Sequence, residues 1–464
     1  MNGQQLYERL PGPLQTLALN AYAGKLHLER FGPKFRRELA RSLERERWPS
    51  AALQEYQHGQ LERLIRHAYD SVPFYRRVFD ERGLTPRDIR TVRDLHKLPL
   101  LTREDVRENV SALISTRFRP GTLKPGRTSG TTGSPLQFYW DREMSFMNNV
   151  VDWRQKATAG LQYGQPHAVL FGRMIVPVNQ RKPPFWRMNY LHNQLWLSTF
   201  HISTQNLEFY LRKLRAFRPR ALEGYPSTVQ MLAQFLDQRG ERLPLGAVLT
   251  TSETLRTDQR ELIERVFECR VFDFYGLAER VIFSTECEKH EGHHVNLDYG
   301  IMEITNDKGE PVEEGELGWI VGTSLHNLGM PFLRYKTGDV TRLRMRRCSC
   351  GRTFPIMDDV TTKAEDIIVT QDGRFISPSV LTHPFKPLQG IAMSQIIQED
   401  RENITVKIVR SSGFRSEQEA ALMHGLQERL GDGMRVRVEY VDDIPRGANA
   451  KFKWVVSRVP LELR

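Results

Sequence analysis

Residues 247–276, AVLTTSETLRTDQRELIERVFECRVFDFYG, decide the fold class. The stretch opens on an apolar run, passes through a polar loop into a segment with helical periodicity, and ends on a second apolar run. Residues 220–240, RALEGYPSTVQMLAQFLDQRG, show the same order of strand, turn and helix, and Gly240 closes that helix. Strands that alternate with helices predict βαβ units around a parallel sheet. We therefore expect an α/β fold, with a large N-terminal domain of mainly parallel sheets flanked by helices.

The two ends of the chain follow different patterns. Residues 35–115 read as helical, and Thr102 caps one of these helices, which has acidic residues in its first turn. The last hundred residues alternate like half-buried strands at 403–410 and 434–441. Between them lies a helix that opens on a capping box of Ser416 and Glu419 and ends at Gly431. We predict a small C-terminal α+β domain over 363–464, after an N-terminal domain over 1–362.

The composition of the chain limits the classes of function that we expect. The chain has 464 residues, 39% hydrophobic and 27% charged, without a run of 18 apolar residues, and its N-terminus does not resemble a signal peptide, so we expect a cytoplasmic protein. The formal charge of +11 fits a partner that carries phosphate, and without a recognition module for DNA or RNA we expect no nucleic acid. The basic segment 30–47 has two readings, a solvated helix face or a peripheral contact with an anionic membrane. The oligomeric state is left open.

Polar turns mark the place where a ligand is expected. In parallel α/β sheets, ligands bind at the carboxyl ends of strands, where this chain has EGYPS (223–227), TTSET (250–254) and YGLAER (275–280). A separate stretch, TSGTTGSP (128–135), is crowded with Gly, Ser and Thr. Such a loop brings backbone N–H groups and hydroxyls to a polyphosphate, although it lacks the Gly-Lys-Ser/Thr of a Walker A loop. A plain flexible linker is the alternative.

Five motifs in order resemble those of the adenylate-forming enzymes, within the phenylacetate–CoA ligase-like branch that includes capsule-biosynthesis relatives. They are TSGTTGSP (128–135), TSETL (251–255), DFYGLAE (273–279), YKTGD (335–339) and IPRGANAKFKWVVS (444–457). The resemblance implies two steps. A carboxylate first attacks the α-phosphate of ATP, giving an acyl-adenylate and pyrophosphate. A thiol or an amine then attacks the acyl carbon.

The resemblance also implies the residues that bind ATP. It assigns the phosphates to small and hydroxylated residues of the first motif: Ser129, Gly130, Thr131, Thr132 and Gly133, with Thr131 counted as catalytic. It assigns the adenine to the strand ends: Ser252, Glu253, Thr254, Asp273, Phe274, Tyr275 and Gly276. Tyr275 is expected to stack on the base.

Charged residues complete the implied site. Glu279 is expected to bind Mg²⁺, a hard cation that prefers carboxylate and phosphate oxygens. Asp339 and Lys363 are expected at the ribose. Lys451 is the expected catalytic lysine, a point charge that reaches the α-phosphate and the carboxylate, and Lys453 competes for the role.

The acid and its acceptor are less defined. The turn beside the small-molecule carboxylic acid is expected at Gly224, Tyr225, Pro226 and Ser227. The acceptor is coenzyme A, an amine or a sugar, and the last two would place the enzyme in polysaccharide or secondary-metabolite biosynthesis without coenzyme A. The sequence departs from the family pattern at Leu136, where many members have Lys, at Lys363, where Arg is usual, and in the GANAK stretch. A relative that binds nucleotide without turnover is therefore a further alternative.

Three of the four cysteines suggest a metal. Cys287, Cys348 and Cys350 with one histidine form the ligand set of a closed structural Zn²⁺ site. His290 has the C-x-x-H spacing and is the predicted fourth ligand, with His293 and His294 as alternatives. The competing interpretation is reduced thiols beside solvent-facing histidines.

Overall fold

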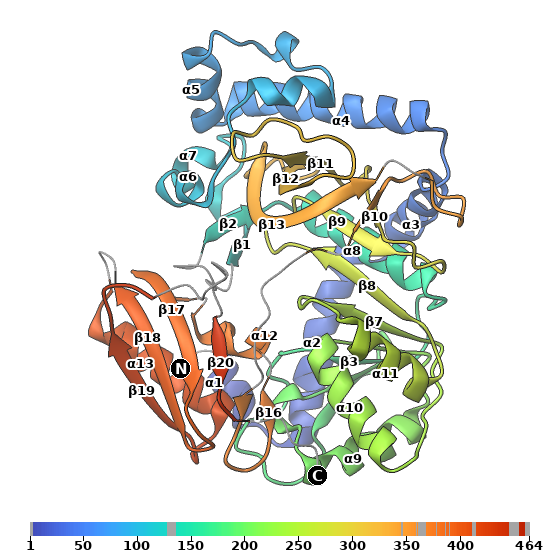
Figure 1. Ribbon diagram of the computed structural model, residues 1–464, viewed down its shortest axis with the longest axis vertical. Helices are drawn as coiled ribbons and strands as arrows, with labels where there is room; N and C mark the ends of the chain where they lie inside the picture. The colour runs from blue at the N-terminus through green and yellow to red at the C-terminus, as the bar shows by residue number, and fades with distance from the viewer. Residues whose placement is uncertain are drawn as a thin grey trace.

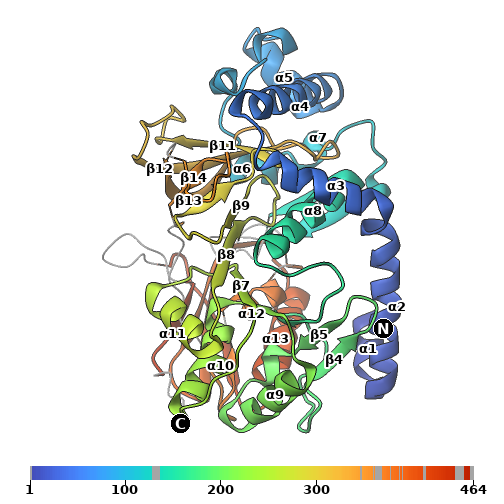
Figure 2. The same ribbon diagram turned by 90° about the vertical axis from the view of Figure 1, so that its right-hand side faces the viewer.

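The computed structural model forms one large α/β body and a small domain beside it (Figures 1 and 2). It describes residues 3–127, 136–344, 347–358, 360, 368–376, 378–385, 387–388, 390–410, 414–444 and 454–459. The α-helices are α1 (Gly3–Glu8), α2 (Gly12–Arg30), α3 (Pro33–Arg45), α4 (Ser50–Ser71), α5 (Pro73–Glu81), α6 (Arg103–Glu108), α7 (Val110–Leu113), α8 (Arg142–Thr158), α9 (Thr204–Phe217), α10 (Pro226–Gln238), α11 (Thr257–Phe267), α12 (Pro378–Leu381) and α13 (Ser416–Leu430). The 3₁₀-helices are η1 (Pro86–Asp88), η2 (Val92–Lys97), η3 (Pro120–Thr122), η4 (Thr199–His201) and η5 (His383–Phe385).

The strands belong to four sheets. They are β1 (Lys124–Arg127), β2 (Gln137–Trp140), β3 (His167–Leu170), β4 (Trp186–Asn189), β5 (Gln194–Leu197), β6 (Ala221–Gly224), β7 (Ala247–Thr251), β8 (Val271–Gly276), β9 (Phe283–Glu286), β10 (His293–Val295), β11 (Gly300–Thr305), β12 (Leu317–Ser324), β13 (Tyr335–Arg344), β14 (Ile356–Met357), β15 (Ile368–Val369), β16 (Phe375–Ile376), β17 (Ile391–Gln398), β18 (Asn403–Arg410), β19 (Arg435–Tyr440) and β20 (Val455–Ser457).

The large sheet confirms the predicted fold class and corrects one detail of it. Its strand order is β11-β12-β13-β14-β10-β9-β8-β7-β6-β3-β5-β4. Only the run β5-β3-β6-β7-β8 is parallel, and the other ladders are antiparallel. The sheet is therefore mixed rather than mainly parallel, because residues 283–357 return through hairpins instead of helical crossovers.

Helices cover both faces of the parallel run. On one face, Leu222 of β6 and Val248 of β7 pack in a cluster with α9, α10 and α11. On the other face, Ala221 and Ala247 pack with α3 and α8. Neighbouring residues of a strand point to opposite faces, so cover on both faces explains why β6 and β7 are buried throughout. The strands, turns and helices predicted for 220–240 and 247–276 are confirmed.

The small domain is α+β, as predicted. Its four strands have the order β19-β18-β17-β20 (orange and red in Figure 1), and α13 packs against them in an apolar cluster that also includes Phe200 and Tyr225 of the body. Helix α13 ends at Gly431, as predicted, but its N-cap is Arg415 and Ser416 is already helical, so the predicted cap is wrong by one residue. Thr102 caps α6, as predicted, and the structure shows that it does so in a capping box with Asp105. The predicted domain boundary at 363 lies outside the described residues.

The N-terminal basic segment is partly buried. It forms α3, and Phe35 and Arg45 of this helix are buried against the body, next to α8. Its remaining face is exposed, so membrane contact stays a prediction that the fold leaves untested. No helix in the described part of the chain combines the length and apolar composition that a membrane crossing requires.

One buried ionic network joins this segment to the sheet. Asp298 accepts two hydrogen bonds from the guanidinium of Arg154, at 2.9 and 3.0 Å, and one from Arg45 at 2.8 Å. Burial disfavours the charge of this carboxylate, yet the two arginines outweigh burial and lower the pKa of Asp298. The network remains ionised because each charge has a partner at hydrogen-bond distance.

We predict that Asp298→Ala strongly destabilises the body. Removing the carboxylate takes from two buried guanidinium groups the acid that they share and leaves Arg45 only Glu38 and Arg154 only Glu46, and breaking a buried pair in this way costs about 3–5 kcal/mol. The thermal unfolding midpoint should fall by several degrees. The matched control is Asp80→Ala, which breaks the solvent-exposed pair with Arg76 and should leave the midpoint almost unchanged. Equal shifts in the two variants would contradict the prediction.

Candidate functional site

The predicted polar turns meet at the carboxyl ends of β6, β7 and β8. These three strands are parallel neighbours, so their ends lie along one edge of the sheet. The turn after β7 contacts the turn after β6 directly, because Glu253 Oε2 accepts a hydrogen bond of 3.0 Å from the backbone N–H of Ser227 at the start of α10. Glu253 thereby satisfies a free N–H of the helix and fixes the two turns relative to each other.

Tyr275 and Asp339 form the centre of the site. The Tyr275 hydroxyl, at the end of β8, donates a hydrogen bond of 2.9 Å to Asp339 Oδ2 on β13. Burial and the nearby carboxylate raise the pKa of Tyr275 well above its usual value, so the hydroxyl keeps its proton and remains a donor. An aromatic ring and a carboxylate that accepts hydrogen bonds are the groups that an adenine base and a ribose diol require, respectively.

A bulge in β13 presents Asp339 to this site. From Trp319 to Val321 the chain advances two residues on β12, whereas the paired residues on β13 run from Val340 to Lys336. The extra residues include Gly338, whose φ is +86°. Only glycine adopts that conformation without strain, so the Gly of the YKTGD motif permits the bulge.

Glu279 lies beside this pair. Its side chain is 6% exposed, and Tyr335 donates a hydrogen bond of 2.7 Å to Glu279 Oε1. Tyr335 is the only hydrogen-bond donor to this carboxylate among the described residues, so the second oxygen keeps its lone pairs for another ligand. A buried carboxylate with one unengaged oxygen fits the expected role in Mg²⁺ binding.

Strands β1 and β2 flank the predicted phosphate loop, which itself lies outside the described residues. They pair antiparallel from Lys124–Trp140 to Arg127–Gln137. The guanidinium of Arg280 lies 3.9 Å from the centre of the Trp140 ring, and this cation–π contact joins the hairpin to the turn that holds Glu279.

Several predicted residues lie outside the described part of the chain. They are Ser129, Gly130, Thr131, Thr132, Gly133, Lys363, Lys451 and the competing Lys453. Their roles stay predictions from the resemblance. Leu136, the first departure from the family pattern, is described and is fully buried in the apolar core.

Asp273 and Phe274 have structural partners. Asp273 accepts a hydrogen bond from Thr250 Oγ1 at 2.5 Å, and its backbone N–H donates to Glu286 Oε2 at 2.7 Å. Burial raises the pKa of Asp273 to about 7. Phe274 stacks on Phe283, with ring centres 4.9 Å apart. These contacts join β7, β8 and β9, and direct binding of nucleotide by Asp273 and Phe274 stays a prediction.

The predicted acid-binding turn contacts the small domain. Gly224 is required by packing, because a Cβ at this position would lie 2.9 Å from Val229 Cγ2. Tyr225 is 8% exposed, its ring meets Phe171 edge-on at 5.2 Å, and it packs in the same apolar cluster as Val380. The turn is thus enclosed between the body and the small domain, and its contact with substrate stays a prediction.

The structure adds two residues that the sequence analysis did not single out. Tyr335 orients Glu279, and Arg280 joins Glu279's turn to the hairpin. Tyr335 is the first residue of the YKTGD motif, which was a usable signal. Arg280 has a φ of +59°, and the sequence carries no signal for that conformation.

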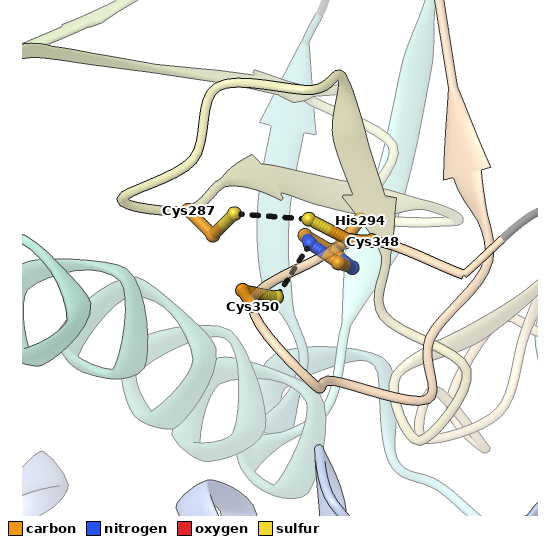
Figure 3. Close-up of side chains that lie close together, drawn as sticks. All are labelled: Cys287, His294, Cys348 and Cys350. Atoms are coloured by element: carbon orange, nitrogen blue, oxygen red, sulfur yellow. Dashed lines mark hydrogen bonds between the residues drawn. The ribbon is translucent and has the colours of Figure 1, made fainter.

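A separate cluster contains the predicted thiols and corrects the histidine. Donor atoms of Cys287, His294, Cys348 and Cys350 lie within 4.8 Å of one another, and the four side chains converge in Figure 3. His290, the predicted ligand, instead approaches Glu286, with Nδ1 3.5 Å from Oε2. The C-x-x-H spacing is misleading, because the chain reverses between Cys287 and His294 in the β9–β10 hairpin, where His294 pairs with Thr285.

Comparisons with known proteins show which family the chain resembles. Residues 368–458 match the family described as the CapK C-terminal domain. Protein CapK of Staphylococcus aureus is 28% identical over 87% of this chain and 89% of its own length. The phenylacetate-coenzyme A ligase of Thermus thermophilus is 30% identical over 70% of this chain and 74% of its own length.

A solved structure shares the fold. It is 2-hydroxyisobutyryl-CoA ligase in complex with 2-HIB-AMP and CoA, with a TM-score of 0.57, 21% identity, and coverage of 89% of this chain and 91% of that chain. The motif order, the site geometry and the relatives agree. The chain belongs to the phenylacetate–CoA ligase-like branch of the adenylate-forming superfamily and is an AMP-forming ligase.

Proposed function

We propose that the protein activates a small carboxylic acid with ATP and transfers the acyl group to coenzyme A. The observation that carries the proposal is the Tyr275–Asp339 pair with Glu279 at the carboxyl ends of the strands. The relatives support the choice of acceptor, since one of them is a phenylacetate-coenzyme A ligase with 30% identity. The cytoplasmic location, where ATP and coenzyme A are available, stays a prediction.

In the first step, a carboxylate oxygen attacks the α-phosphorus, the bond to the β-phosphate oxygen breaks, and pyrophosphate leaves. We assign the adenine to the ring of Tyr275 and the ribose hydroxyls to Asp339. Glu279 would hold Mg²⁺, which would neutralise charge on the phosphates. The 128–135 loop and Lys451 would supply the remaining phosphate contacts.

In the second step, a thiol attacks the acyl carbon, the bond to AMP breaks, and the thiol proton passes to solvent. We place the acid beside Tyr225, because this side chain and Phe171 form an apolar, aromatic wall close to the Tyr275 edge of the sheet. Such a wall favours an acid with an aromatic or apolar side chain over a charged one.

We predict that pyrophosphate release depends on Glu279. With ATP, Mg²⁺ and a panel of aryl, aliphatic, hydroxy and amino acids, Glu279→Gln should lower kcat about 100-fold or more, because it removes charge where the phosphates react. Tyr335→Phe keeps the charge and removes only the orienting hydrogen bond, so its loss should be smaller. Glu310→Gln, an exposed surface change, is the control and should keep full activity.

The same panel of acids, assayed with coenzyme A, an amine or a sugar added, identifies the acceptor from the product that forms. Acid-dependent pyrophosphate release together with an acyl-coenzyme A product supports the proposal. Release without thioester, with an amide or ester formed when an amine or sugar is added, would replace coenzyme A by that acceptor. ATP binding without release from any acid would contradict catalysis and favour the nucleotide-binding alternative.

A further prediction separates the role of the Tyr275 ring from the role of its hydroxyl, which donates a hydrogen bond to Asp339. Tyr275→Phe keeps the ring and loses the hydrogen bond to Asp339, which contributes about 1 kcal/mol, so KM for ATP should rise roughly fivefold with little change in KM for the acid. Tyr210→Phe is the matched control, since this buried tyrosine bonds the carbonyl of Ser198 far from the site. An unchanged KM for ATP in Tyr275→Phe would contradict the assignment of this pair to the nucleotide.

A further inference from the structure

The Cys/His cluster has the dimensions of a tetrahedral metal site. Cys287 Sγ lies 3.6 Å from Cys348 Sγ, and Cys350 Sγ lies 3.5 Å from His294 Nε2 (dashed lines in Figure 3). Tetrahedral Zn²⁺ with bonds of about 2.3 Å to sulfur and about 2.0 Å to nitrogen separates two sulfurs by about 3.8 Å, and sulfur from nitrogen by about 3.5 Å. Both observed separations agree with these values. A disulfide would need about 2.05 Å, and all four cysteines of the chain are free.

Backbone groups around the cluster form hydrogen bonds with three of the four ligands. His294 Nδ1 lies 3.1 Å from the carbonyl oxygen of Phe354, so this nitrogen carries the proton and donates it. The lone pair of Nε2 therefore points into the cluster. The N–H of Lys289 donates to Cys287 Sγ, and the N–H of Arg352 donates to Cys350 Sγ, each at 3.4 Å. Fixed tautomers and N–H donors to sulfur are the outer contacts that metal ligands require.

The loop that carries two of the ligands is firmly anchored. Arg352 Nε lies 3.0 Å from Glu46, just beyond α3, and Nη1 lies 2.8 Å from Glu288. The backbone N–H of Thr353 also donates to the Glu46 carbonyl at 2.8 Å. The cluster is therefore held in place from both sides before any ion binds, which lowers the entropic cost of binding.

The cluster lies at the weakest joint of the large sheet. Strand β14 has two residues, and it alone pairs with both β10 and β13, through two residue pairs on each side. One half of the sheet carries Tyr275 on β8, and the other carries Asp339 on β13. Cys287 and His294 belong to the β9–β10 hairpin, whereas Cys348 and Cys350 lie in the loop between β13 and β14. The four ligands thus bridge this joint.

The opposite face of the β9–β10 hairpin leads to the nucleotide strand. Glu286 and His293 immediately precede the ligands Cys287 and His294 in the sequence. Glu286 and His293 are paired with each other across the β9–β10 ladder. Glu286 accepts the N–H of Asp273 on β8, and His293 Nε2 lies 3.8 Å from Asp273 Oδ2. A shift of the hairpin would therefore move β8 and Tyr275 with it.

We propose that Cys287, His294, Cys348 and Cys350 bind one structural Zn²⁺, which joins the two halves of the large sheet and fixes Tyr275 against Asp339. Three thiols lose their protons when the ion binds, and the four protein ligands leave no open position for catalysis. The metal-binding part of this inference is independent of the proposed enzymatic function, whereas the positioning part rests on it.

Metal content tests the binding directly. Protein purified without chelator is analysed for zinc and iron by plasma mass spectrometry, beside four variants. The wild type should hold about one zinc per chain, and Cys348→Ser and His294→Ala should lose most of it. Cys269→Ser and His290→Ala are the matched controls, since Cys269 lies apart on the body and His290 approaches Glu286, and both should keep the zinc.

Cobalt reports on the ligand set even where a variant folds poorly. Wild-type protein exchanged with Co²⁺ should show intense visible bands of tetrahedral cobalt and a thiolate charge-transfer band, and Cys350→Ser should weaken the latter. Wild-type protein without zinc, or octahedral cobalt spectra, would overturn the site. Zinc lost in His290→Ala but kept in His294→Ala would overturn the assignment of the ligand.

The positioning role has its own measurement. Chelation of zinc from the wild type should weaken ATP binding by calorimetry at least roughly fivefold, matching the loss of the Tyr275–Asp339 contact, and added Zn²⁺ should restore it. Full ATP affinity in zinc-free, folded protein would overturn the positioning role and leave metal binding intact. No ATP binding even in the zinc-loaded protein would instead contradict the proposed function.

Discussion

The proposed nucleotide site depends on the joint between two halves of one sheet. The parallel half supplies Tyr275, the hairpin half supplies Asp339, and the two residues meet through a single hydrogen bond of 2.9 Å. Among the described strands, β14, with two residues, is the one whose pairing joins the two halves of the sheet. Short ladders resist displacement weakly, so other contacts must fix the relative position of the halves: the buried Asp298 network near α3, the Arg280–Trp140 contact and the Cys/His cluster.

Much of this arrangement could be predicted from local signals. The apolar runs, the capping box at Thr102 and the terminal Gly240 and Gly431 each depend on a few neighbouring residues, and the structure confirms the elements they define. The carboxyl-end rule for parallel strands places the turns at 223–227, 250–254 and 275–280 on one edge of the sheet, and the parallel pairing of β6, β7 and β8 confirms this. The motif order identified the branch, and the relatives confirm it.

The remainder depends on long-range pairing that local patterns do not contain. His290 has the better spacing from Cys287, but the register of the β9–β10 hairpin brings His294 to the sulfurs. Alternation of strands and helices predicted a mainly parallel sheet, whereas the hairpins of 283–357 extend it with antiparallel strands. Tyr335 belongs to a recognisable motif, but its bond to Glu279 depends on a partner far along the chain, and the sequence around Arg280 carries no signal for its left-handed conformation.

The small domain contacts the body through polar groups and through a shared apolar cluster. Arg374 donates a hydrogen bond of 2.7 Å to the carbonyl of Phe200, and Arg181 pairs with Asp372 at 3.2 Å on the surface. Exposed ion pairs stabilise a contact little, and the apolar contribution of the body to the shared cluster comes mainly from Phe200 and Tyr225. The apolar cluster that Phe200 and Tyr225 share with the small domain therefore stabilises the contact more than the surface ion pair does, and it includes the turn that we propose binds the acid.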